Sequence, residues 1–220
     1  MTVSTDPGSV APVAAPGGGA PARRSQPWLV VVALVLGLAL GVAAGLLIPR
    51  LTHPGDDSVE AGFLRDMSTH HAQAVEMSMI AHASSTNPRI VTLAGDIALT
   101  QHGQIGYMQA WLRDWNLSPT GSQPPMAWMP NSAGAVVNGL MPGMATPEQL
   151  ATLRKATGNN LDVQFLTLMR AHHLGGIHMA QEALDLSDDK NVDWLAQQMV
   201  AGQQSELGLI DSLLKELQPA

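Results

Sequence analysis

Two stretches of this sequence place a methionine three residues before a pair of adjacent histidines. They are "FLRDMSTHHAQAVEM" at residues 63–77 and "FLTLMRAHHLGGIHM" at residues 165–179. Neutral imidazole nitrogen binds first-row transition metals, and thioether sulfur favours soft ions such as Cu(I). The chain has no cysteine, which excludes thiolate ligands and disulfides. The candidate metal ligands are therefore His70, His71, His172 and His173, together with Met67, Met77, Met169 and Met179.

The two motifs belong to a gap-free internal repeat with an offset of 165 − 63 = 102 residues. The same offset aligns "LAGDIALTQHGQIGYMQAWL" from Leu93 with "LAQQMVAGQQSELGLIDSLL" from Leu195. Apolar residues recur at helical spacing in all four segments, which predicts helices over residues 58–83, 88–114, 161–185 and 190–217. Short connections make antiparallel neighbours, so we expect an all-α fold in which two repeated helical hairpins form an antiparallel four-helix bundle over residues 58–217.

Residue types at the predicted helix ends support this division. Asp57 followed by Glu60 resembles a capping box, and Asn87-Pro88 is a typical helix start. Asn160 and Asp189 are the expected N-caps of the other two helices. Each predicted helix therefore has a plausible beginning.

Residues 115–160 form the predicted crossover between the hairpins. Within it, Thr146-Pro147 is expected to start a short helix that Gly158 ends. The crossover also contains Met126, Met129, Met141 and Met144, which we interpret as packing residues because methionine fills irregular apolar gaps.

The histidine pairs fall on the apolar stripes of their helices, which places them at a packed interface. Adjacent helical residues point about 100° apart, so His70 and His71 are expected to face different neighbouring helices. Gln104 and Glu206 are equivalent under the 102-residue offset and lie on the apolar stripes of the partner helices. A carboxylate in a core needs a partner, and a histidine is the expected one for Glu206, which joins the candidate site.

A structural reading of these residues remains open. Methionine at helical spacing usually belongs to a core, and a buried histidine is usually just hydrogen-bonded. Two adjacent histidines in a core, in both copies of the repeat, nevertheless cost stability because polar groups are removed from water. This cost favours a functional role for the histidine pairs. His53, His102 and His178 lie off the apolar stripes or in a linker, and they are not expected to be ligands.

Residues 28–48, "WLVVVALVLGLALGVAAGLLI", contain no charge and are long enough to span a bilayer as one transmembrane helix. Arg23 and Arg24 precede the span, which favours a cytoplasmic amino terminus and an extracytoplasmic bundle. We expect residues 1–27 to be a disordered cytoplasmic tail and residues 49–57 to be a linker. A cleaved signal peptide is the alternative, although its apolar region is usually shorter. The expected location is a single-pass protein of the cell membrane.

The net charge of −7 argues against nucleic acid as a partner, because phosphate binding favours a basic surface. The expected partners are a copper ion and the membrane. A second copy of the chain or a membrane complex would be a further partner.

The motifs "FLRDMSTHHAQAVEM", "MPGMATPEQLATLRKATG" and "FLTLMRAHHLGGIHMAQEAL" resemble the domain of unknown function 305 family over about residues 57–217. The resemblance implies an exported, ferritin-like helical domain, and some family members are associated with copper binding and copper tolerance. It also implies acidic residues in the second and fourth helices of the bundle, and Gln104 departs from that pattern.

The functional hypothesis is extracytoplasmic copper sequestration or transfer by a membrane-anchored protein. A scaffolding module of a membrane complex, with structural histidines, is the alternative. A ferritin-like metal oxidase is a third reading, but the sequence lacks the Glu-x-x-His pairs that such enzymes use.

Overall fold

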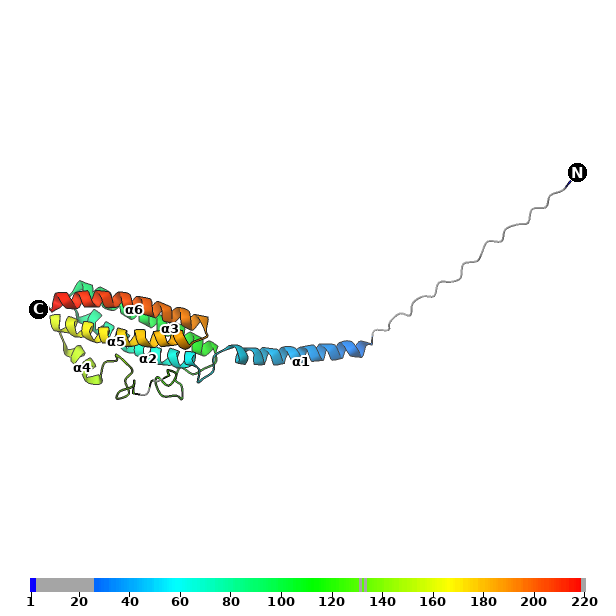
Figure 1. Cartoon of the computed structure of the whole chain (residues 1–220), viewed down its shortest axis with the longest axis horizontal. Coiled ribbons are helices and arrows are strands. Elements are labelled where there is room, and N and C mark those ends of the chain that lie inside the picture. The colour runs from blue at the N-terminus through cyan, green and yellow to red at the C-terminus, as the bar shows by residue number, and fades with distance from the viewer. Residues whose placement is uncertain (3–25, 131, 133, 219–220) are drawn as a thin grey trace. The chain divides into compact units, whose positions relative to one another are not determined.

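The computed structural model describes residues 1–2, 26–130, 132 and 134–218, and all of its regular elements over these residues are helices. The helices are α1 (Pro27–Thr52), α2 (Val59–Ser84), α3 (Pro88–Asp114), α4 (Pro147–Lys155), α5 (Gly158–Leu186) and α6 (Lys190–Leu217) (Figure 1). The chain divides into two compact units, residues 1–47 and 48–220. The predicted tail over residues 1–27 lies almost entirely outside the described residues.

The first unit contains most of α1, whose residues Pro27–Ile48 have a mean hydropathy of 2.8 and no buried side chain. This stretch is long and apolar enough to cross a membrane, a test that membrane anchors and signal sequences both pass. The helix itself continues to Thr52, so the segment predicted as a linker over residues 49–57 begins in helical conformation.

The second unit is a helical bundle built from two hairpins. α2 packs along α3, α5 packs along α6, and the hairpins meet through α2 and α5. The backbone N–H of Asp188 donates to Glu60 Oε1 (3.1 Å), and Ser85 Oγ donates to Asp162 Oδ1 (2.6 Å). Because these contacts join the start of each central helix to the end of the other, α2 and α5 run antiparallel. The prediction of an all-α bundle made from two repeated hairpins is confirmed.

The helix caps agree with the sequence at two of the four bundle helices. Asn87 Oδ1 accepts from the N–H of Arg89, and Asp189 Oδ1 accepts from the N–H groups of Asn191 and Val192, as predicted.

The start of α2 differs from the prediction, because Ser58 and not Asp57 is its cap. Ser58 Oγ accepts from the N–H of Ala61 (3.2 Å). Asp57 instead accepts a hydrogen bond from Gln123 of the crossover (3.0 Å), and Glu60 binds the α5–α6 connection. Asp57 and Glu60 were expected to form a capping box, but both side chains accept hydrogen bonds from residues far away in the sequence.

The crossover contains the predicted short helix, with Thr146 and Gln149 forming a capping box at its start. The prediction for its end was wrong. α4 ends at Lys155, and Gly158 is the first residue of α5, two residues earlier than the predicted cap at Asn160. Gly158 has a φ of +55°, a left-handed conformation that glycine adopts readily, so it makes the turn between the helices and shortens the predicted 115–160 crossover.

Residues 141–145, which we name the strap, cross the contact between α2 and α5. The Gln73 side chain makes two hydrogen bonds with the backbone of Ala145, one donated (2.9 Å) and one accepted (2.6 Å). On α5, a Cβ atom at Gly175 would lie 2.0 Å from the carbonyl oxygen of Pro142. Gln73 and Gly175 are equivalent under the 102-residue offset, so the two copies of the repeat hold the strap by different means.

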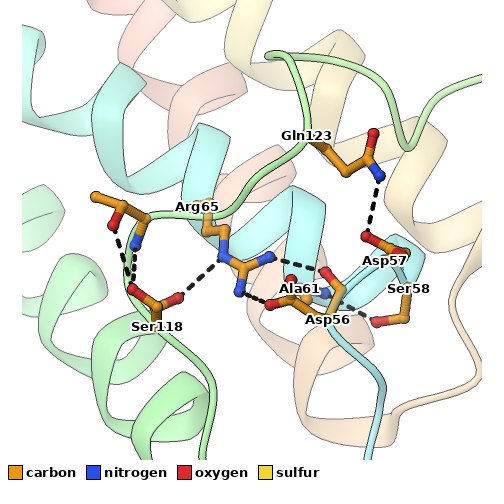
Figure 2. A network of polar contacts seen from close by, with 8 residues as sticks. Asp56, Asp57, Ser58, Ala61, Arg65, Ser118 and Gln123 are labelled. Carbon is orange, nitrogen blue, oxygen red and sulfur yellow. Dashed lines mark hydrogen bonds and ion pairs between the residues drawn. The ribbon is translucent and has the colours of Figure 1, made fainter.

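Arg65 of α2 joins the segment before the bundle to the start of the crossover (Figure 2). Its guanidinium donates to the backbone oxygen of Asp56 (2.8 Å), to Asp56 Oδ1 (2.5 Å) and to the backbone oxygen of Ser118 (3.0 Å). The Arg65 side chain that makes these hydrogen bonds is only 9% exposed. Arg65 therefore ties Asp56 and the start of the crossover to α2.

We expect Gly175→Ala to destabilise the bundle, because the new methyl group would collide with the strap backbone, which cannot rotate away as a side chain can. Overpacking of this kind costs about 1–3 kcal/mol. Gly106→Ala in α3 is the matched control, since a Cβ atom there meets nothing within 4 Å and should stabilise the helix slightly. Urea denaturation of both variants measures the difference. Equal stabilities for the two variants would show that the strap does not rest on α5.

Candidate metal centre

The four histidines of the two motifs lie inside the bundle, where α2 meets α5. His70, His71 and His173 are completely buried, and His172 is 1% exposed. The rings of His70 and His172 have centroids 3.7 Å apart with planes inclined by 35°. The apolar stripes thus place both pairs at the helix interface, as the sequence predicts.

The central pair, His70 and His172, is held by backbone oxygens. His70 Nε2 lies 3.0 Å from the carbonyl oxygen of Pro142 in the strap. His172 Nε2 lies 2.9 Å from the carbonyl oxygen of His70 itself. A carbonyl can only accept, so each ring donates its Nε2–H, and this fixes the tautomer that leaves a lone pair on Nδ1.

The outer pair, His71 and His173, is held by side chains from the partner helices. His71 Nε2 lies 2.7 Å from Gln104 Oε1 on α3, and His173 Nε2 lies 2.5 Å from Glu206 Oε2 on α6. Glu206 therefore has the histidine partner expected from the sequence, and Gln104 makes the equivalent contact in the other hairpin. Both rings again donate through Nε2 and keep a lone pair on Nδ1.

All four Nδ1 atoms are buried and have no hydrogen-bond partner in the structure. A buried polar atom without a partner costs roughly 1–3 kcal/mol, and such atoms are uncommon in native proteins. Four of them gathered in one region have the chemistry of metal ligands, because a metal-bound histidine typically donates its other ring N–H to a carboxylate, an amide or a backbone carbonyl.

Three of the rings, those of His70, His71 and His172, are neutral at neutral pH. Burial lowers the pKa of His70 to about 4, and burial together with the neighbouring His70 ring lowers the pKa of His71 to about 3. Burial, followed by repulsion from His70 and the other rings, also holds the pKa of His172 well below 6.5. A neutral imidazole is the form that binds metal, so protons compete weakly for these nitrogens.

The four motif methionines are completely buried at both ends of the histidine region. Met77 and Met169 belong to one apolar cluster of the core, and Met67 and Met179 belong to the other. Each cluster thus takes one methionine from each motif. This crossed distribution of the motif methionines between the two clusters follows from the antiparallel packing of α2 against α5.

Within the described ranges, no group of three or more His, Cys, Asp or Glu side chains is arranged to hold a metal ion. A centre made from these histidines therefore needs thioether sulfur, or a rotation of the rings, to complete its ligand set. The donors present, imidazole Nδ1 and thioether sulfur, fit copper better than they fit a hard ion such as Mg²⁺.

Sequence reasoning did not single out three buried polar groups of the bundle. The carbonyl oxygen of Pro142 has no side-chain signature, so its contact with His70 has no signal in the sequence. The amides of Gln101 and Gln203 are 2% and 4% exposed, and each has polar atoms without a partner. These two glutamines are identical residues at equivalent positions of the repeat, a signal that could have identified them.

The other histidines and methionines discussed in the sequence differ in burial. His53, His102 and His178 are exposed. Met126, Met129 and Met141 of the crossover are buried in the apolar core, and Met144 packs against it.

Comparison with known proteins identifies the bundle. The family model described as "Domain of unknown function (DUF305)" matches residues 60–214. A DUF305 protein from Streptomyces coelicolor, described as secreted, has a crystal structure that is 42% identical with a TM-score of 0.68, covering 74% of this chain and 96% of that chain. Comparison with curated proteins gives no significant match.

Two further structures extend the likeness. A DUF305 fragment from Deinococcus radiodurans is 30% identical with a TM-score of 0.60, covering 72% of this chain and 96% of that one. CopM in its Cu(II)-bound form is 22% identical with a TM-score of 0.57, covering 73% of this chain and 98% of CopM, and it shares the fold. Because the family model and the more similar structures agree over the whole bundle, the chain belongs to the DUF305 family.

Proposed function

We propose that this protein binds copper at the buried histidine centre and acts in copper sequestration or transfer outside the cytoplasm. The observation that carries the proposal is the set of four buried Nδ1 atoms, each with a lone pair and no partner. The proposed ligands are drawn from His70, His71, His172 and His173, with thioethers from Met67, Met77, Met169 and Met179. Glu206 takes part through its hydrogen bond to His173.

The ligand types support copper in particular. Imidazole suits both oxidation states, and buried thioethers add donors that favour Cu(I). The fixed tautomers support metal binding in general, because the ring orientation needed for coordination through Nδ1 is already set by the Nε2 contacts. CopM, which shares this fold, has been crystallised with Cu(II), with Cu(I) and with silver.

The proposed location is the outer side of the cell membrane, with α1 as the anchor. The span Pro27–Ile48 has the length and hydropathy of a transmembrane helix. Arg23 and Arg24 before it favour a cytoplasmic amino terminus. The Streptomyces coelicolor relative is described as secreted, which agrees with an extracytoplasmic bundle.

A scaffolding module with structural histidines is the second candidate. The observation that favours it is that every Nε2 atom already has a protein partner, so the rings could serve as a hydrogen-bond network between hairpins. Under this alternative the bundle would present its outer faces to a membrane complex or to a second copy of the chain. Metal binding distinguishes the two candidates.

We expect the full chain, purified in detergent without a histidine tag, to bind copper tightly, and replacement of His70, His71, His172 and His173 by Gln to abolish that binding. Removal of outer contacts to metal ligands already costs about 10–100-fold in affinity, and loss of the ligands themselves should exceed this. Competition against a copper chelator at neutral pH measures the affinity. Circular dichroism reports whether the variant keeps its helical content.

The matched control replaces the exposed His53, His102 and His178 by Gln, which should leave copper affinity unchanged.

Leu replacements of Met67, Met77, Met169 and Met179 should weaken Cu(I) binding more than Cu(II) binding while roughly conserving core volume. Equal copper affinity in the parent chain and in folded histidine and methionine variants would eliminate the buried histidine centre as the copper site, and would leave the crossover methionines or the scaffolding candidate.

We also expect the metal-free bundle to lose stability as the pH falls from about 6.5 towards 4. The unfolded chain takes up protons on its histidines near pH 6.5, whereas folded His70 and His71 stay neutral down to about pH 4 and 3. Folding is therefore disfavoured progressively through this window, by roughly 2 kcal/mol for each of these two rings at pH 5. Urea denaturation at pH 7.5 and pH 5 measures the loss.

Two variants test the origin of this pH dependence. His70→Gln should make stability less dependent on pH, and the exposed His102→Gln should not. If both variants keep the full dependence of the parent chain, the buried rings are not its source.

The orientation of α1 gives a further prediction. Protease added outside intact spheroplasts should cleave accessible sites beyond residue 51 and spare the amino-terminal tail, as judged by antibodies to tags at the two ends. Cleavage of the tail with protection of the bundle would reverse the orientation, and release of the bundle into the medium would identify a cleaved signal.

A further inference from the structure

The two halves of the histidine centre are chemically unequal. Gln104 and Glu206 occupy equivalent positions of the repeat, and each accepts the Nε2–H of an outer histidine, His71 or His173. The contact distances are 2.7 Å for the amide and 2.5 Å for the carboxyl oxygen. The geometry is therefore repeated, while the charge of the acceptor is not.

Glu206 is the acidic side chain that reaches this centre. Among the described residues, it is the one carboxylate that makes a hydrogen bond with any of the four buried histidines. The buried acidic residues Asp162 and Glu60 are engaged elsewhere, since Asp162 accepts from Ser85 and Glu60 accepts from the N–H of Asp188. The negative charge near the centre is thus placed on the α5–α6 side.

A carboxylate that accepts the N–H of an imidazole makes the other ring nitrogen a better electron donor, and a neutral amide does so much less. It also supplies negative charge beside a buried cation, where a low effective dielectric strengthens the attraction. Both effects increase with the charge of the metal ion. Glu206 supplies them next to His173, whereas His71 has only the neutral amide of Gln104 as its acceptor.

We propose that Glu206 is a positioning residue that makes His173 the dominant ligand for a divalent ion, so that the α5–α6 half of the centre binds Cu(II) more tightly than the α2–α3 half. This inference rests on the proposed function and goes beyond it by ranking the ligands. It also assigns Gln104 the opposite role, that of a partner which holds His71 without adding charge. The acceptor at position 206 then contributes to the selectivity between Cu(II) and Cu(I), in addition to the thioethers.

The matched variants are built into the repeat. Glu206→Gln reproduces the histidine–glutamine pair that the bundle already contains at positions 71 and 104, so the fold should tolerate it. We expect this variant to lose about 10–100-fold in Cu(II) affinity and markedly less in Cu(I) affinity, measured on the full chain in detergent by chelator competition. His173→Gln should weaken Cu(II) binding more than His71→Gln does.

The exchange variant Gln104→Glu/Glu206→Gln separates positioning from general support of the fold. It should recover most of the Cu(II) affinity that Glu206→Gln loses, and that affinity should now depend on His71 in place of His173. The Cu(II) paramagnetic resonance spectrum should show nitrogen ligands in both the parent chain and the exchange variant. A purely structural role for Glu206 would give no such transfer of dependence.

The outcomes distinguish this inference from the proposed function. A parent chain that binds no copper contradicts the proposed function. A parent chain that binds copper, with Cu(II) affinity unchanged in Glu206→Gln or with equal losses in His71→Gln and His173→Gln, contradicts the ranking alone. A Glu206→Gln protein that fails to fold is replaced by Gln104→Glu, which should tighten Cu(II) binding, and unchanged or weaker binding there overturns the proposal.

Discussion

The burial of four imidazole rings at the contact between two helical hairpins is the constraint on which the rest of the bundle depends. A neutral imidazole carries one donor and one acceptor, and leaving either without a partner in a core costs roughly 1–3 kcal/mol. The fold satisfies every Nε2–H of these rings, with two backbone carbonyls, one amide and one carboxylate. It satisfies none of the Nδ1 atoms. The division between donors and acceptors is the same for all four rings, which is the basis for treating the Nδ1 atoms as a binding site.

The strap gives the repeat its asymmetry. His172 donates to the backbone of α2, and a strictly symmetric bundle would have His70 donate to the backbone of α5. His70 donates instead to Pro142 of the strap, which covers the α2–α5 contact at this point. The positions that hold the strap, Gln73 and Gly175, have diverged to suit this one-sided element, the former by adding hydrogen bonds and the latter by removing a side chain. Together with Gln104 and Glu206, they turn a duplicated hairpin into a centre with two different halves.

Most of the bundle could be predicted from the sequence, because its information is local or repeated. Helical spacing and the 102-residue offset predicted the hairpins, and the polar positions on the apolar stripes predicted that Glu206 would meet a histidine. The same local rules failed at Asp57 and Gly158, where long-range contacts and a left-handed turn decided the outcome. The contact between His70 and the Pro142 carbonyl could not be predicted for a related reason. Every residue has a backbone oxygen, so no residue type indicates this contact between positions 72 residues apart. The crossed distribution of the motif methionines between the two core clusters could not be predicted, because it depends on the packing direction of α2 against α5, which the repeat alone does not specify.

The central claim is that the buried histidines present free Nδ1 lone pairs to a metal ion, and nitrogen-resolved NMR of the imidazole rings tests it most directly. Long-range ¹⁵N–¹H correlation spectra of the metal-free protein should show the Nε2–H tautomer for His70, His71, His172 and His173 at neutral pH. Addition of diamagnetic Cu(I) under reducing conditions should shift the Nδ1 resonances of rings that become ligands and leave the exposed histidines unaffected. Nδ1–H tautomers in the metal-free protein, or Nδ1 resonances that do not move with Cu(I), would contradict the account.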